Sequence, residues 1–183
     1  MHSSFPSAHD APAFVPYRGG FSLLTEDGEL LHLSAQALRE RLAALPPALV
    51  VHAPALARRL GLPAPGQPAP WLDLLELFAF VHPARPAVPT PRGLALALGL
   101  DAEGQETIEA DLLPNLLATL LNDLRQRNTG AEADSLAAFC LRMAQAGWPW
   151  AGTVAETLEL ETRLTPRGTL PEAALQPADA LRV

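Results

Sequence analysis

The sequence predicts an α/β fold, with a small mixed sheet near the start of the chain and helices over the rest. Two observations predict it. Short apolar runs between residues 13 and 52 are bounded by turn signals, which is typical of strands. From residue 71 onward, apolar residues recur at helical spacing, and Ala and Leu, both strong helix formers, supply most of them.

The composition limits the possible classes of protein. Hydrophobic residues make up 49% of the 183 residues and charged residues 18%, which indicates a globular chain with a core. The net charge of −7 gives no general attraction to nucleic acid, so any such contact is local or comes from another domain. The single cysteine, Cys140, excludes an internal disulfide and a zinc site of several cysteines, and its apolar neighbours predict a place in a helix core.

No segment predicts contact with a membrane. The longest apolar run is too short and too interrupted to cross a bilayer. The first ten residues lack a basic region followed by an apolar stretch, so we expect no signal peptide and a cytoplasmic protein.

The first half of the chain predicts a hairpin, a helix, a buried strand and a second helix. Residues 21–24 and 29–33 are strand candidates on either side of a turn signal at residues 26–28, and Phe14-Val15 is a further apolar pair. Ser34 is a good N-cap for a helix over residues 35–45.

A buried strand and another helix are expected next. The adjacent valines within residues 48–52 are typical of a strand buried on both faces. The helix over residues 53–61 ends with Gly61 as its C-terminal cap. The Pro-rich residues 61–70 predict an extended surface loop.

Residues 71–83 are the most hydrophobic segment with a helical period. Leu74, Phe78 and Val81 fall on one face, so we expect a core helix. Asp73 stands at the N-cap position, and Pro83 ends the helix.

The second half of the chain predicts four more helices. They cover residues 91–99, 106–125, 132–146 and 153–162. Thr90 caps the first with Pro91 at its opening position, and Thr153 caps the last. We expect one domain over residues 1–164, followed by a tail or linker over residues 165–183 that leads toward a downstream region.

Four short motifs occur in a fixed order along this framework. They are Val51-His52-Ala53, Asp73-Leu-Leu-Glu-Leu77, Leu98-Gly-Leu100 and Glu109-Ala-Asp111. In this order they resemble the motifs of DEDD-type 3′–5′ exonuclease domains of the ribonuclease H-like fold. Residues 80–85, 89–93 and 147–150 also resemble the N-terminal region of bacterial DinG-like DNA helicases, where such a domain precedes the ATPase motor. The resemblance covers residues 21–150.

The resemblance implies a ribonuclease H-like fold and a site of four carboxylates that hold two metal ions. At the positions where the family has its other catalytic residues, this chain has Ala57, Ile108 and Leu113. Asp27-Gly-Glu29 fits the first motif, Asp-x-Glu, but falls on the predicted turn. At most a remnant of the site is expected, with the candidates Asp27, Glu29, His52, Asp73 and Asp111. No catalytic residue, metal or other cofactor is therefore expected in this chain.

The function expected from these observations is that of a non-catalytic accessory or docking domain of an ATP-dependent DNA helicase in DNA repair. No Gly-x-x-x-x-Gly-Lys-Ser/Thr motif is present, so the motor would be a downstream domain and the main partner. DNA contact would be weak or indirect. Trp148 and Trp150, on either side of a proline, predict a packing plug or a surface that docks a partner.

Two other functions fit the sequence. One is an active exonuclease dependent on magnesium or manganese, whose carboxylates align differently; convergence of three or more acids would favour it. The other is a free-standing adaptor, which is distinguished by whether the reading frame continues past Val183 into ATPase motifs. Six arginines could line one face for nucleic acid or form an ordinary solvated surface: Arg39, Arg41, Arg58, Arg59, Arg85 and Arg92.

Overall fold

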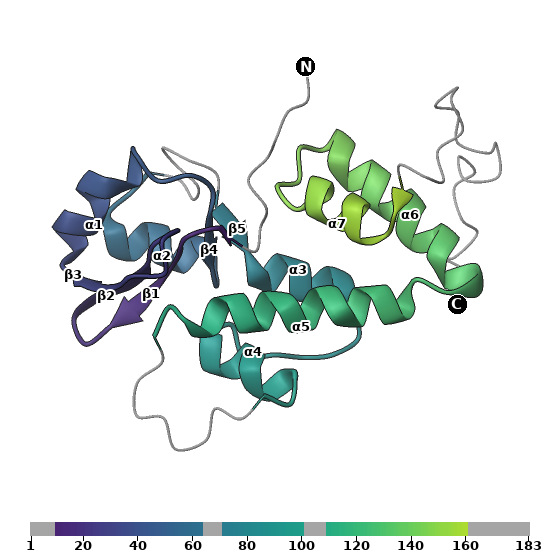
Figure 1. Ribbon diagram of the computed structural model, residues 1–183, viewed down its shortest axis with the longest axis horizontal. Helices are drawn as coiled ribbons and strands as arrows, with labels where there is room; N and C mark the ends of the chain where they lie inside the picture. The colour runs from purple at the N-terminus through teal and green to yellow at the C-terminus, as the bar shows by residue number, and fades with distance from the viewer. Residues whose placement is uncertain (1–9, 64–70, 101–108, 161–183) are drawn as a thin grey trace. The chain divides into compact units, whose positions relative to one another are not determined.

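Five strands form one mixed sheet in the order β3-β2-β1-β4-β5 (Figure 1). The computed structural model describes residues 10–63, 71–100 and 109–160. The chain divides into two compact units, residues 1–124 and 125–183, and the sheet belongs to the first. The predicted α/β class with a mixed sheet and a helix-rich second half is confirmed.

The first three strands form an antiparallel meander, and the last two add in parallel. The meander is β1 (Ala13–Tyr17), β2 (Gly20–Leu24) and β3 (Leu30–Leu33). Next to β1 lie β4 (Ala48–Val50) and β5 (Trp71–Asp73), so β2 alone runs against the other four strands. The predicted hairpin is β2–β3, and β1 extends it by one strand.

Glycine is needed where β1 turns into β2. The two-residue turn Arg18-Gly19 has φ angles of 35° and 85°, the left-handed pair that matches the twist of a hairpin. At Gly20, a Cβ atom would stand 2.3 Å from the carbonyl oxygen of Leu33, so β2 can lie beside β3 there only without a side chain. The rings of Tyr17 in β1 and His32 in β3 stack in parallel across β2, with centroids 4.1 Å apart.

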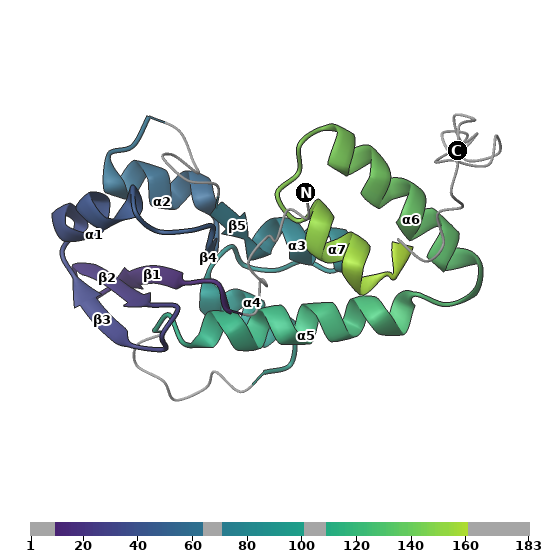
Figure 2. The same ribbon diagram turned by 45° about the horizontal axis from the view of Figure 1, so that its top comes forward.

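Two helices cover one face of the sheet. They are α1 (Ala35–Leu42) and α2 (Ala53–Leu60), side by side in Figure 2. Their buried leucines pack with the strand residues Phe14, Phe21 and Trp71 in one apolar cluster. The ring of Phe14 meets that of Trp71 edge to face, with centroids 5.4 Å apart. This cluster is the core of the sheet side of the first unit.

The remaining helices of the first unit are α3 (Leu74–Val81), α4 (Pro91–Ala97) and most of α5 (Leu112–Arg127). The α4 helix lies beside the first half of α5 in both views (Figures 1 and 2). The buried Ser22 of β2 accepts a hydrogen bond at 3.2 Å from the backbone N–H of Ala110, just before α5. This bond fixes the start of α5 against the sheet.

Most predicted caps are confirmed. The side chains of Ser34, Asp73 and Thr90 accept backbone N–H groups at the starts of α1, α3 and α4. Gly61, with a φ of 65°, ends α2.

Several predicted boundaries were wrong, and the helix predicted over residues 35–45 ends at Leu42. Residues 71–73 form β5, because a short strand buried on both faces has the same continuous apolar pattern as a buried helix. The α5 helix begins at Leu112, so that Pro114 falls in the first turn, where no N–H donor is needed; residues 106–108 of the predicted helix lie outside the described residues. The last helix begins at Ala151, which places Thr153 inside it. Residues 165–183 of the predicted tail lie outside the described residues.

The second unit contains α6 (Gly130–Gln145) and α7 (Ala151–Thr157), which follow the end of α5. Arg127 at the end of α5 forms an ion pair with Glu132 in the first turn of α6. Cys140 and Trp150 are buried, and the thiol of Cys140 lies 3.6 Å from the carbonyl oxygen of Ala151. The prediction that Cys140 occupies a helix core is confirmed.

We expect Phe78→Ala to lower the free energy of unfolding by about 3–5 kcal/mol, because truncating a buried aromatic side chain leaves a cavity. The Phe78 side chain on α3 is only 2% exposed. Leu96→Ala on α4 is the control, since Leu96 is 52% exposed and its truncation should change stability by less than about 0.5 kcal/mol. Equal urea midpoints for the two variants would contradict the core assignment.

Candidate functional site

The carboxyl ends of β1, β4 and β5 lie along one edge of the sheet, because these three strands are parallel. In open α/β sheets, ligands bind at this edge where the chain turns in opposite directions from neighbouring strands. Here the chain leaves β1 toward β2 on one side of the sheet and leaves β4 toward β5 on the other. The carboxyl ends of β1 and β4 are therefore the candidate position. The residues at this edge are Tyr17, His52 and Asp73.

Pro16 limits the pairing of β1 with β4 near this edge. Tyr17 and Gly20 flank the two-residue turn and form a hydrogen-bonded pair, so the alternating pattern directs the nitrogen of Pro16 toward β4. A proline nitrogen carries no hydrogen and cannot extend the ladder. The two strands pair at Ala13 and Leu49, and β4 ends at Val50. The ladder between β1 and β4 therefore stops short of the carboxyl edge.

The buried carboxylate of Asp73 joins two strand–helix junctions. Its Oδ1 accepts from the backbone N–H of His52 at 2.9 Å and of Leu75 at 3.0 Å, and its Oδ2 accepts from that of Ala53 at 2.7 Å. It therefore caps α3 and also satisfies two N–H groups at the start of α2. A buried charge is tolerated when hydrogen bonds of this kind surround it. These bonds assign Asp73 a structural role.

His52 adopts a backbone conformation that few residues take. Its φ of 62° places it in the left-handed region, which residues other than Gly seldom adopt, although Asn, Asp and His adopt it more often than the rest. This turn directs the N–H groups of His52 and Ala53 to the carboxylate of Asp73. The imidazole is half-buried and has no hydrogen-bond partner within the part of the chain that the structure describes.

Asp27 and Glu29 lie at the opposite edge of the sheet. They belong to the loop from β2 to β3, and β2 runs against β1, with Leu24 paired to Ala13 at the amino end of β1. The five residues of β1 separate the two edges by about 16 Å, at roughly 3.3 Å per residue. Asp27 and Glu29 therefore cannot share an ion with Asp73. The turn itself is confirmed: the N–H of Gly28 donates to the carbonyl of Thr25 at 3.0 Å.

Asp111 precedes α5, over the β2–β3 side of the sheet, and is exposed. Its neighbour Glu109 reaches His32 of β3, with 3.3 Å between Oε1 and Nε2. Across residues 10–63, 71–100 and 109–160, no three His, Cys, Asp or Glu side chains gather closely enough to hold a metal ion. The residues present do not fit the four-carboxylate site that the resemblance implies.

The aligned family positions are apolar in the structure as well as in the sequence. Ala57 is buried on the face of α2 that packs against the sheet, and Leu113 is fully buried in the first turn of α5. Ile108 lies outside the described residues. No carboxylate can come from the two described positions.

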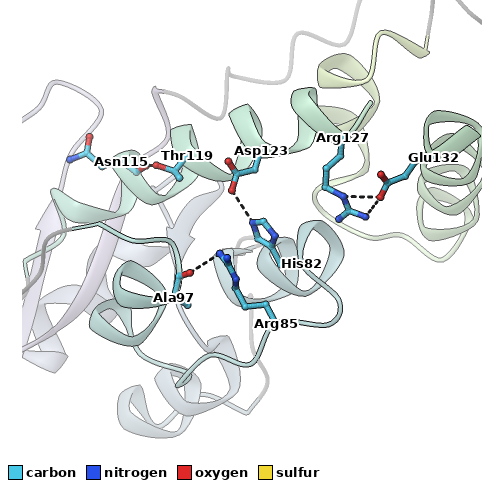
Figure 3. Close-up of polar contacts among 8 residues, drawn as sticks. All are labelled: His82, Arg85, Ala97, Asn115, Thr119, Asp123, Arg127 and Glu132. Atoms are coloured by element: carbon cyan, nitrogen blue, oxygen red, sulfur yellow. Dashed lines mark hydrogen bonds and ion pairs between the residues drawn. The ribbon is translucent and has the colours of Figure 1, made fainter. Parts of the chain in front are cut away.

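Sequence patterns did not reveal a second polar contact, between α3 and α5. His82 ends α3, and its Nε2 lies 2.9 Å from Oδ2 of Asp123 on α5, as Figure 3 shows. The ring of Phe78 lies 5.3 Å from the His82 ring, and Arg85 donates to the carbonyl of Ala97 at 2.8 Å. The nearby hydroxyl of Thr119 donates to the carbonyl of Asn115, one turn earlier on α5. The contact fastens the end of α3 to α5.

The two tryptophans differ in exposure. Trp150 is fully buried, which favours the packing interpretation for that residue. Trp148 is half-buried, and its backbone N–H bonds the carbonyl of Met143 at the end of α6. Of the two candidates for docking, only Trp148 presents side-chain surface.

Comparison with protein-family models, with curated proteins and with solved structures finds no match to this chain. Among the helices that the structure describes, none is both long and apolar enough to cross a membrane.

We expect Asp73→Ala to destabilise the protein by at least about 3 kcal/mol, because three backbone N–H groups lose their acceptor and each buried loss costs roughly 1–3 kcal/mol. Asp73→Asn should cost less, since an amide oxygen still accepts. Asp111→Ala, an exposed acid, is the control and should shift stability by less than about 0.5 kcal/mol. Chemical denaturation measures all three, and a neutral Asp73→Ala would refute the structural role.

Burial raises the pKa of the Cys140 thiol from 9.0 to about 11. Between pH 9 and pH 11, the unfolded thiol loses its proton while the folded thiol keeps it, so stability should fall as the pH rises through this range. The slope should be smaller in Cys140→Ser. A thiol reagent at pH 8 should react slowly with the native protein and rapidly in urea; equally fast reaction in both would place the thiol at the surface.

Proposed function

We propose that this chain is a nuclease-like domain of ribonuclease H-like fold that has lost catalysis and serves as an accessory, docking domain of a DinG-like ATP-dependent DNA helicase. The layout of the first unit supports the family assignment. An antiparallel meander is followed by two parallel strands, each of which leads into a helix. His52 follows β4 by two residues and Asp73 is the last residue of β5, in the order that the family motifs require.

One observation supports the proposed loss of catalysis. The first strand, β1, has the sequence Ala-Phe-Val-Pro-Tyr, so the strand where the family places Asp-x-Glu contains no acid. The buried acid at the same edge, Asp73, is bonded to three backbone N–H groups. Two-metal hydrolysis needs several carboxylate oxygens around the ions. The chemistry of this edge favours a structural domain over an active exonuclease.

A domain without catalysis can still act through its surface. The second unit contains half-buried Trp148 and, on α6, Phe139 with 56% of its surface exposed. Exposed aromatic side chains are enriched where proteins associate. We assign the docking of the motor to this unit. Of the two tryptophans predicted as docking residues, only Trp148 is kept in this role.

We expect no 3′–5′ exonuclease activity in magnesium or manganese, because no set of carboxylates among the described residues can hold the ions. The measurement uses a single-stranded DNA labelled at its 5′ end, with gel analysis of its length. Asp27→Asn and Asp73→Asn are assayed beside the wild-type chain, because each removes one candidate carboxylate of the metal site. Metal-dependent shortening by the wild-type chain that either variant abolishes would overturn the proposal in favour of the active exonuclease.

The helicase assignment has a separate test in the gene. The reading frame past the codon for Val183 should encode ATPase motifs, including Gly-x-x-x-x-Gly-Lys-Ser/Thr. A stop codon there, with no motor bound by the chain, would favour the free-standing adaptor.

A further inference from the structure

The loop between α3 and α4 is rich in proline. Pro83, Pro86 and Pro89 follow one another at intervals of three residues. Pro83 comes directly after the C-cap of α3, where it stops the helix, and Pro91 opens α4. Pro86 and Pro89 lie between these boundaries and are exposed, and neither helix requires them.

Local stereochemistry favours a polyproline II conformation over residues 85–89. A proline holds its own φ at about −65° and favours an extended backbone in the residue before it. The N–H groups of Ala87 and Val88 donate to no backbone carbonyl in the part of the chain that the structure describes. Polyproline II needs no internal hydrogen bonds and has about three residues per turn. In this conformation Pro86 and Pro89 lie on the same side of the segment.

Contacts with α4 fix the loop in place. The guanidinium group of Arg85 donates to the carbonyl oxygen of Ala97 at 2.8 Å (Figure 3). The backbone of Val88 lies against Gly93 in the first turn of α4, where a Cβ atom would stand 2.3 Å from the carbonyl oxygen of Val88. The same carbonyl accepts the N–H of Thr90 at 2.7 Å. The segment is therefore ordered without a partner, which lowers the conformational entropy lost on binding.

The loop has an apolar surface with positive charges beside it. Val88 is 63% exposed, more than any other large apolar residue among those described. Residues 77–100 contain two arginines, Arg85 and Arg92, and no acid, in a chain whose net charge is −7. Both arginines are exposed. The complementary surface is a groove of aromatic side chains with acids at its rim.

We propose that residues 85–89 are a docking segment for a partner domain that binds polyproline II in such a groove. SH3, WW and EVH1 domains bind Pro-x-x-Pro segments in this way, and the segment here is Pro86-Ala-Val-Pro89. The inference does not depend on the nuclease-like or helicase assignment. It uses a loop of the first unit, whereas docking of the motor is assigned to the second.

The test applies the complete chain, labelled with a fluorophore, to an array of purified SH3, WW and EVH1 domains. Binding to at least one of these classes is expected, and fluorescence anisotropy then measures its affinity. Pro86→Ala/Pro89→Ala should weaken binding about tenfold or more, because a few central anchor residues account for most of the affinity of an interface. Affinity should also fall as salt is raised, since salt screens the arginines.

The chain offers a matched control. Pro65→Ala/Pro68→Ala removes two prolines at the same spacing, and this second pair lies outside the described residues. The control should keep the wild-type affinity. A synthetic peptide of residues 82–92 should bind severalfold more weakly than the chain, because it must be ordered on binding. Circular dichroism melting checks that both variants fold.

Three outcomes would overturn the inference. They are no binding to any domain of the array, unchanged affinity in Pro86→Ala/Pro89→Ala, and equal losses in that variant and in the control. A peptide that binds as tightly as the complete chain would refute the part assigned to the contacts with α4.

Discussion

The carboxylate of Asp73 is the interaction on which the carboxyl edge of the sheet depends. Helices leave their first N–H groups without partners, and at this edge two helices begin within a few residues of two adjacent strands. One carboxylate accepts N–H groups from both helix starts, so the junction between β4 and α2 is held to the junction between β5 and α3. This arrangement requires the left-handed backbone conformation at His52. The unfavourable conformation is confined to that residue, whose φ is 62°.

The same interaction explains why an acid in a family-like motif need not be catalytic. Asp73 stands at the end of a parallel strand, where ligands of α/β proteins usually bind. Its oxygens are nevertheless turned toward the backbone, and a metal ion there would have to displace hydrogen bonds that hold two helices. In this chain the acid maintains the geometry of the edge, while β1 supplies no carboxylate beside it.

Local signals predicted much of the fold. The caps Ser34, Gly61 and Thr90 act on residues within one turn, so the sequence contains what determines them. The strand β1 was harder to predict, because Pro16 interrupts its strand-like sequence pattern. The strand β5 was harder to predict, because it continues directly into a core helix. Their pairing depends on neighbours that lie far away in the sequence.

The candidate site was less predictable for a related reason. Asp27 and Glu29 have the spacing of a metal motif, but the direction of β2 places them at the far edge of the sheet. The contact from His82 to Asp123 joins residues 41 positions apart. Motif order along the chain gives no information on which edge or which helix a side chain faces, and that information comes from strand direction.

The two edge strands of the sheet have a consequence for how the protein meets other chains. An edge strand has a row of backbone groups that another strand can pair with, which is a common start of aggregation. Here β3 has four residues and β5 three, and β5 passes immediately into α3. Among the described residues, so little extended backbone lies at either border that a foreign strand could form only a few ladder hydrogen bonds with it, which limits growth of the sheet by intermolecular pairing.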